Sequence, residues 1–189
     1  MSNILKQKER GSLIVVSGPS GCGKGTVIKE FLKNNSNSWL SISCTSRDPR
    51  PGDIPNESYF FLSREQFKTC IDNNEFLEWA EFSGNMYGTQ KEYVQRKLKE
   101  GKNLILEIDT KGALNVKNIM PEATLIFILP PSFEELEARL RGRHTETEEA
   151  IQKRLESTRL EMENSKQFDY QVVNDSVENA VLKLEEIML

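Results

Sequence analysis

Short runs of consecutive apolar residues alternate along this chain with segments whose apolar residues recur at helical spacing. The runs Leu13–Val16, Leu104–Asp109 and Leu125–Leu129 have the form of strands that are buried on both faces. Such an alternation is typical of an α/β domain with a mainly parallel sheet flanked by helices. We therefore predict a core sheet built from strands near residues 13, 40, 104, 125 and 171.

A second group of strands lies between the first two core strands and the third. The segments Tyr59–Leu62 and Phe76–Phe82 alternate apolar and polar residues and lie close together in the sequence. They predict a smaller, mixed or antiparallel sheet inserted at about residues 45–89. The segment Trp39–Cys44, just before this insertion, is predicted to be one core strand.

Helix starts are marked by capping patterns, in which Ser or Thr is followed three residues later by Glu or Gln. Pairs of this kind predict helices that open at Ser63, Thr89 and Ser132. A long charged helix is predicted over about residues 147–165, and a closing helix over 177–188.

Three segments are rich in the residues that interrupt regular structure. Two prolines and a glycine predict an irregular loop at 47–53, and Gly84 with Gly88 predicts a turn over 83–88. The arginine-rich segment 139–146 is predicted to be a mobile polar loop.

Length and charge limit the function classes. The 189 residues fit one domain, and the net charge of −4 argues against a general nucleic-acid binder. No apolar run approaches the length of a membrane span, and the polar N-terminus lacks the apolar core of a signal peptide. The three cysteines have no metal-ligand spacing, which favours reduced thiols and a cytoplasmic location.

A glycine-rich stretch, Gly18–Thr26, joins the first strand to the first helix. The order strand, glycine-rich turn, helix is the context of a phosphate-binding loop, whose backbone N–H groups surround phosphate oxygens. Lys24 is placed to put a positive charge on the β- and γ-phosphates. Gly25 stands where Ser or Thr usually follows the lysine, so the ligands of a magnesium ion stay undetermined.

Arginines elsewhere in the chain are candidates for further phosphate contacts. Arg47 and Arg50, on a proline-stiffened loop, can grip a second phosphate, although a pair of solvated surface arginines fits the pattern equally. Arg139, Arg143 and Arg154 bracket a polar segment that can close over a transferring group. A salt-bridged helix face is the alternative for these three.

Acids near strand ends are candidates for reading a base. Glu78 carries a carboxylate that can accept from both N1–H and N2–H₂ of guanine, whereas adenine offers an acceptor at N1 and no 2-amino group. Asp109 ends a buried strand, where ligands bind in such sheets. For Glu107, a purely structural role fits the sequence as well as a role in binding. Tyr59 and Tyr87 can donate hydroxyls to a phosphate, or serve only for packing.

Taken together, these segments resemble the guanylate kinase family. The resemblance covers nearly the whole chain in the family's order, through the segments 18–26, 43–52, 78–89, 107–109, 142–149 and 173–175. It implies a P-loop NTPase-type core at 1–44, 90–132 and 167–189, a GMP-binding insertion at about 45–89, and a helical lid at about 133–166. It also implies the magnesium-dependent conversion of ATP and GMP (or dGMP) to ADP and GDP, in purine nucleotide metabolism.

The resemblance also implies a role for each matched residue. The residues expected to bind ATP are Gly21, Cys22, Gly23, Lys24, Gly25, Thr26 and Asn174, the last near the adenine. The residues expected to bind GMP are Ser43, Arg47, Arg50, Tyr59, Glu78, Tyr87, Thr89 and Asp109. The residues expected to act in catalysis are Lys24, Arg50, Arg143 and Arg154.

Two other functions stay open from the sequence. One is a kinase for a different nucleoside monophosphate, against which Glu78, Ser43 and Thr89 argue. The other is a catalytically inactive, guanylate-kinase-like module that binds protein partners, against which Lys24, Arg143 and Arg154 argue. A GTPase is disfavoured because no Asn-Lys-x-Asp motif occurs, and the oligomeric state is not indicated.

Overall fold

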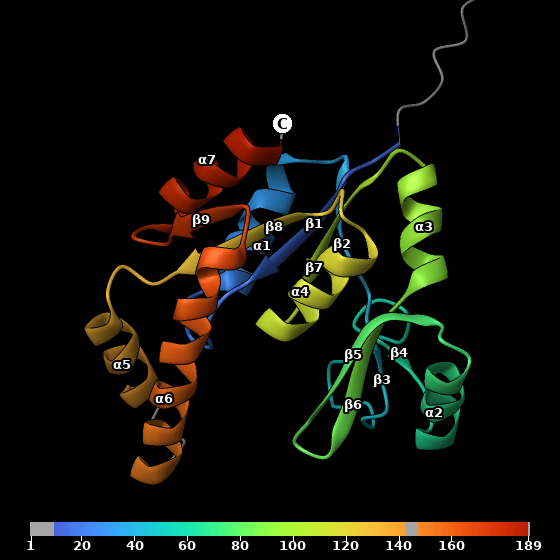
Figure 1. The fold of residues 1–189 in the computed structure, drawn as a ribbon, viewed down its shortest axis with the longest axis horizontal. Coiled ribbons are helices and arrows are strands. Elements are labelled where there is room, and N and C mark those ends of the chain that lie inside the picture. The colour runs from blue at the N-terminus through green and yellow to red at the C-terminus, as the bar shows by residue number, and fades with distance from the viewer. Residues whose placement is uncertain (1–9, 143–146, 189) are drawn as a thin grey trace, which may run out of the picture.

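The computed structural model describes residues 10–142 and 147–188, without the side chain of Arg139 (Figure 1). Its larger sheet has five strands in the order β2 (Ser38–Leu40), β7 (Asn103–Glu107), β1 (Leu13–Ser17), β8 (Thr124–Leu129) and β9 (Tyr170–Val173). Every neighbouring pair in it is parallel. The carboxyl ends of these strands therefore meet along one edge, where ligands bind in open α/β sheets.

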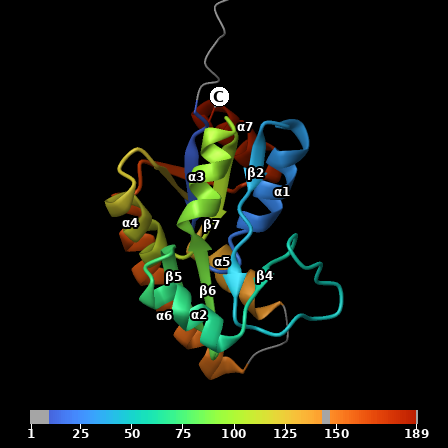
Figure 2. The same cartoon turned by 90° about the vertical axis from the view of Figure 1, so that its right-hand side faces the viewer.

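Helices cover both faces of this sheet because alternate strand residues point to opposite sides. Leu13 and Val15 pack with α3 (Lys91–Lys99) and α4 (Thr110–Ile119), whereas Ile14 and Val16 pack with α1 (Lys24–Asn34) and α7 (Val177–Met188). Figure 2 shows the two helix pairs on opposite sides of the strands. The consecutive apolar residues of the first strand thus feed two separate cores.

The smaller sheet has four strands in the order β4 (Phe60–Phe61), β3 (Cys44–Thr45), β6 (Asn85–Gln90) and β5 (Phe76–Phe82). β3 is parallel to β4, while β6 is antiparallel to both β3 and β5. Helix α2 (Arg64–Asp72) buries Phe67 against this sheet and begins with the predicted capping box of Ser63 and Gln66.

Helices α5 (Phe133–Arg141) and α6 (Glu148–Asn164) form a pair held by Leu136, Leu140, Ile151 and Leu155. A 3-10 turn (Ser165–Gln167) connects α6 to β9. In Figure 1 the α5–α6 pair lies at the left of the view and the small sheet lies at the right. The carboxyl edge of the large sheet therefore lies between two appendages.

The mainly parallel core flanked by helices is confirmed, and so is a mixed second sheet. The division of the chain into core, insertion and lid stays a prediction. None of the helices in the described ranges is both long and apolar enough to span a membrane.

The single strand predicted over 39–44 is wrong. The chain leaves the large sheet after Leu40 and enters the small sheet at Cys44. Leu40 pairs with Ile105, whereas Cys44 pairs with Gly88 and Phe60. The alternation of apolar and polar residues over 39–44 does not show which partner strand each end of the segment pairs with. One sequence pattern therefore contained two short strands.

The turn predicted over 83–88 is too long, and the helix cap predicted at Thr89 is wrong. Only Ser83 and Gly84 form the turn, both with positive φ (50° and 77°), and strand β6 begins at Asn85. Thr89 lies within β6, and its hydroxyl donates to Glu78 instead of capping α3. The helix cap is Gln90, without a side-chain hydrogen bond.

The loop predicted over 139–146 is wrong for its first three residues, which complete α5. The helix continues because Leu140 is buried against α6. Residues 143–146, including Arg143, lie outside the described residues.

Candidate active site

The phosphate loop adopts a backbone that only glycine accommodates easily. Gly18, Gly21 and Gly23 have φ values of 146°, 91° and 90°. A Cβ atom on Gly18 would lie 2.3 Å from the carbonyl oxygen of Ile128 in the neighbouring strand. These glycines let the loop turn tightly at the carboxyl end of β1 and deliver the chain into α1.

Lys24, the first residue of α1, folds back across the loop. Its Nζ donates hydrogen bonds to the carbonyl oxygens of Gly18 (2.6 Å) and Pro19 (3.1 Å). The ammonium group is therefore held at the mouth of the loop, beside the orphan N–H groups of a helix N-terminus. This combination attracts an anion.

Cys22 turns its side chain into the core that α1 and α7 form on the large sheet. Burial raises the pKa of its thiol, while the charge of Lys24 acts in the opposite direction. Any contact of Cys22 with a ligand therefore falls to its backbone. The backbone carbonyl is already engaged, because it accepts a hydrogen bond of 2.7 Å from Nδ2 of the buried Asn174.

A cavity of about 430 Å³ opens between the small sheet and the carboxyl end of β7. It gathers five of the eight residues predicted to bind GMP, namely Ser43, Tyr59, Glu78, Tyr87 and Asp109. Thr89 lies directly behind, bonded to Glu78. Residues distant in the sequence are thus brought to one cavity.

Glu78 is buried, with 8% of its surface exposed. Its Oε1 accepts a hydrogen bond of 2.7 Å from the hydroxyl of Thr89. Burial raises the pKa of Glu78, the bond from Thr89 opposes the rise, and the charge of Asp109 adds to it. A buried acid with a spare oxygen and a raised pKa is typical of a functional site.

Asp109 caps the start of α4, where its Oδ1 accepts from the backbone N–H of Gly112 at 2.7 Å. A Cβ atom on Gly112 would lie 3.0 Å from Oε2 of Glu78 and 3.3 Å from Oδ1 of Asp109. The two carboxylates thus converge on one backbone position that has no side chain.

Arg47 is buried between aromatic rings and an acid. Its guanidinium lies 5.3 Å from the ring centroid of Tyr59, and its Nη2 lies 2.9 Å from Oδ2 of Asp53. The ring of Tyr59 is in turn 6.1 Å from that of Tyr87. The predicted phosphate-binding residues Arg47, Tyr59 and Tyr87 therefore form a continuous group.

Asp53, which sequence reasoning missed, organises this loop. It accepts a hydrogen bond from the backbone N–H of Arg50 at 2.7 Å as well as the ion pair from Arg47. These two donors hold the pKa of Asp53 below its usual range. Arg50 is itself exposed and does not line the cavity.

The arginines of α5 and α6 lie in different environments. Arg154 is half-buried on α6, whereas Arg141 is bonded to Glu137 and Glu148. Arg141, for which no phosphate contact is predicted, thus belongs to a salt-bridged helix face.

Glu161 was also missed, seven residues beyond Arg154 and therefore on the same face of α6. Burial raises the pKa of Glu161, while a hydrogen bond with Ser157 and the charge of Lys24 lower it. The charge of Lys24 in the phosphate loop therefore acts on this face of α6.

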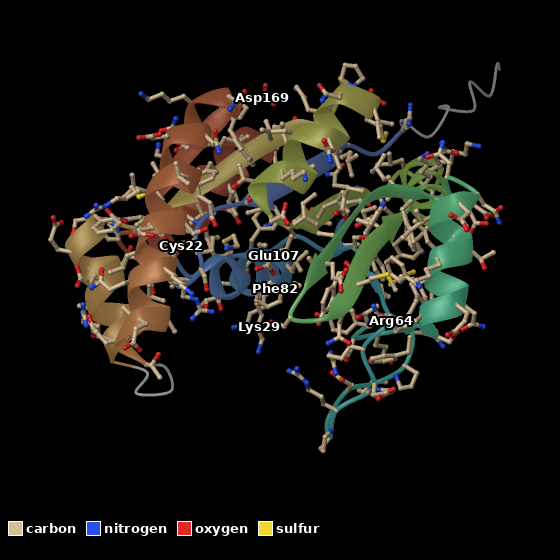
Figure 3. All side chains as sticks on the ribbon, turned by 60° about the horizontal axis from the view of Figure 1, so that its bottom comes forward. Cys22, Lys29, Arg64, Phe82, Glu107 and Asp169 are labelled. Carbon is tan, nitrogen blue, oxygen red and sulfur yellow. The ribbon has the colours of Figure 1, made fainter. Side chains whose placement is uncertain are left out.

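The cavity is also lined by five residues that were not selected from the sequence as site residues: Ala80, Phe82, Gly88, Glu107 and Ile108. Ala80 and Phe82 follow Glu78 at a spacing of two on β5, so strand periodicity was the signal that could have found them. Figure 3 shows Phe82 at the tip of the β5–β6 hairpin, close to Glu107 of the core.

Metal binding by the protein alone has little support. Residues 10–142 and 147–188 hold no group of three or more His, Cys, Asp or Glu side chains arranged for a metal ion. An acidic oxygen donor does face the loop, since a Cβ atom on Gly25 would lie 3.7 Å from the carboxylate of Glu107. This donor set fits a hard cation that arrives with ligand phosphates and keeps several waters.

Comparison with known proteins gives a consistent result. The family model described as guanylate kinase matches residues 10–189. The chain is 52% identical to the guanylate kinase of Clostridium tetani over 180 residues, which cover 95% of this chain and 86% of that protein. It is 48% identical to the guanylate kinase of Prochlorococcus marinus (strain NATL2A), covering 94% and 96% of the two chains.

A solved structure extends the likeness to the fold. The crystal structure of guanylate kinase from Anaplasma phagocytophilum matches with a TM-score of 0.75 and 31% identity. The match covers 96% of this chain and 86% of that one. With the loop, the cavity and these likenesses in agreement, the chain belongs to the guanylate kinase family.

Proposed function

We propose that this protein transfers the γ-phosphoryl group of ATP to GMP, giving ADP and GDP, and that it accepts dGMP as well. A phosphate oxygen of GMP attacks the γ-phosphorus, and the bond from that phosphorus to the β,γ-bridging oxygen breaks. One observation carries the proposal: a single cavity joins the buried acid Glu78 to the strand end that lies beside the phosphate loop.

The chemistry of Glu78 supports guanine as the acceptor base. Its Oε1 is engaged by Thr89, and burial makes an unpaired charge at this position costly. Guanine supplies two N–H donors along one edge, so it offsets the cost of burying the Glu78 charge better than adenine does. Asp109 and Ser43 line the same cavity and complete the proposed base site.

The group of Arg47, Tyr59 and Tyr87 supports a site for the phosphate of GMP. The guanidinium and the two ring hydroxyls are cation and donors of the kind that phosphate accepts. Arg50, on the same loop, is proposed to join them and to contact the transferred group.

Lys24 and the backbone of Gly21, Cys22, Gly23, Gly25 and Thr26 are proposed to hold the phosphates of ATP. Phosphoryl transfer needs positioning and charge neutralisation more than covalent participation. Arg154, on the half-buried face of α6, is proposed to add positive charge to the transferred group. Arg143 has the same proposed role, from the sequence alone.

Magnesium is proposed to accompany ATP, with Glu107 and Thr26 as the residues that would hold it or its waters. When bound, it would neutralise charge on the β- and γ-phosphate oxygens. A cytoplasmic location belongs to the proposal as well.

The experiment is a coupled assay of ADP formation with ATP and GMP, run on the wild type and on Lys24→Ala. Removing one preorganised donor at a developing charge typically costs about 10²–10³ in rate. We expect a loss of this size in kcat for Lys24→Ala, with GMP binding measured by calorimetry unchanged. Near-normal turnover in the variant would contradict the kinase proposal and favour the protein-binding module.

A further inference from the structure

We propose that Asn174 is a positioning residue that sets the orientation of the Cys22–Gly23 peptide in the phosphate loop, and thereby the affinity for triphosphate. This inference rests on the proposed kinase function. It gives Asn174 a task different from the place near the adenine that the resemblance implies.

Asn174 follows the last strand of the large sheet, β9, and two hydrogen bonds fix its position. Its backbone N–H donates to the carbonyl oxygen of Leu129 at 2.8 Å, which extends the ladder between β8 and β9. Its side-chain Nδ2 donates to the carbonyl oxygen of Cys22 at 2.7 Å. The residue is buried, with 5% of its surface exposed.

The amide nitrogen must be the atom that faces Cys22, because an amide oxygen in its place would oppose a second acceptor. The bond therefore pulls the carbonyl of Cys22 towards β9. The Cys22–Gly23 peptide is trans, so the N–H of Gly23 points away from β9. A phosphate-binding loop needs this N–H directed into its concave side.

Gly23 fits this arrangement in two ways. Its φ of 90° lies in the left-handed region, which glycine tolerates. In addition, a Cβ atom at this position would lie 2.5 Å from Nδ2 of Asn174. The absence of a side chain at Gly23 and the presence of an amide at Asn174 are therefore parts of one contact.

The sequence distance explains why the role is not apparent from the motif. Asn174 is 152 residues from Cys22, and only the parallel order β1, β8, β9 brings the end of β9 to the loop. The loop motif consists of glycines and a lysine, and it does not identify the residues that orient the peptide groups of the loop.

The test uses the full chain with Asn174→Asp and Asn174→Leu, both close in size to Asn. An ionised carboxylate cannot donate to the Cys22 carbonyl, and leucine has no donor at all. At pH 8 we expect both variants to raise the KM for ATP about tenfold, as for a buried acceptor left unsatisfied. The KM for GMP should stay unchanged, which also reports that the variants fold.

The pH profile separates this role from a merely structural one. As the pH falls, the protonated carboxyl of Asn174→Asp regains a donor, so its affinity for ATP should recover towards that of the wild type. Asn174→Leu should show no such recovery. Calorimetry with inorganic tripolyphosphate, which has no base, should show the same losses as ATP.

Asp175→Asn is the matched control, since Asp175 is the exposed neighbour and forms local hydrogen bonds with Ser176 and Asn179. It should bind ATP, GMP and tripolyphosphate as the wild type does. The inference is overturned if tripolyphosphate binding is normal while ATP binding is lost, because Asn174 then acts on the base. It is overturned as well if the Asp and Leu variants bind ATP normally at every pH. A wild type that binds tripolyphosphate but forms no GDP contradicts the proposed function instead.

Discussion

Glu78 is an acid that the fold buries without a cation beside it in the described residues. Thr89 occupies one of its oxygens, and Asp109 is a second negative charge nearby. The raised pKa of Glu78 means that ionising this carboxyl costs more in the folded protein than in the unfolded chain. A ligand with two N–H donors removes the cost of burying the ionised form, which links the stability of the free protein to the choice of base.

Glu78→Gln should therefore stabilise the protein in the absence of nucleotides at neutral pH. The stability that wild-type Glu78 contributes when protonated is full below the ordinary Glu pKa of about 4.3 and is lost as the pH rises through the raised pKa. The advantage of the variant should thus appear above that window and vanish below it. Urea unfolding of both proteins from pH 4 to pH 8 measures this difference. An advantage that is independent of pH would show that the charge of Glu78 is not what burial penalises.

Single residues could be selected from the sequence where one residue type has one distinctive chemistry. Glu78, Lys24 and the loop glycines were selected in this way, and Glu78 lines the cavity in the structure. Asp53 and Glu161 could not be found, because their significance depends on Arg47 and on Lys24, which only the fold brings near them.

Among the elements, the β5–β6 hairpin supplies the largest share of the residues that line the cavity. The strand patterns in the sequence did not reveal this contribution. The sequence pattern predicts a turn over much of β6 because Gly88 lies within it. In the structure Gly88 lies at a crowded position, since a Cβ atom there would lie 3.0 Å from Cβ of Trp79. Gly88 therefore marks a crowded strand position and not a turn. The presence of a glycine in the sequence does not by itself distinguish these two situations.

The same hairpin presents Phe82 at its tip, 66% exposed and on the wall of the cavity. Burying about half of such a ring against bound nucleotides would contribute about 1 kcal/mol, or about fivefold. Phe82→Ala should therefore lower kcat/KM for GMP by about fivefold and increase hydrolysis of ATP by water relative to transfer. Thermal unfolding should change little, because the side chain is exposed in the free protein.

Trp79→Ala is the control for Phe82, because Trp79 is an exposed aromatic on the opposite face of β5. It should leave the ratio of hydrolysis to transfer unchanged. Equal effects of the two variants on this ratio would show that Phe82 acts through the stability of the hairpin and not at the cavity.

At the scale of the whole molecule, the carboxyl edge of the large sheet lies between the small sheet and the α5–α6 pair (Figure 1). The sequence predicts the mainly parallel large sheet and its flanking helices well, because buried parallel strands and amphipathic helices leave strong local patterns. It predicts the junctions poorly, as the divided strand at 39–44 and the helical residues 139–141 show. At a junction, the partner strand or helix decides the structure.

The central claim is that this arrangement selects guanine as the acceptor base, and a substrate panel tests it most directly. The measurement is kcat/KM for GMP, dGMP, AMP, UMP and CMP at fixed ATP and magnesium, with wild type and Glu78→Gln. A buried charge left without its partner costs about 1–3 kcal/mol, so GMP should exceed AMP by at least about tenfold in the wild type. Glu78→Gln should reduce that ratio, since its amide can turn an NH₂ group towards N1 of adenine. A wild type that phosphorylates AMP as well as GMP, or a ratio that Glu78→Gln leaves unchanged, would contradict the account.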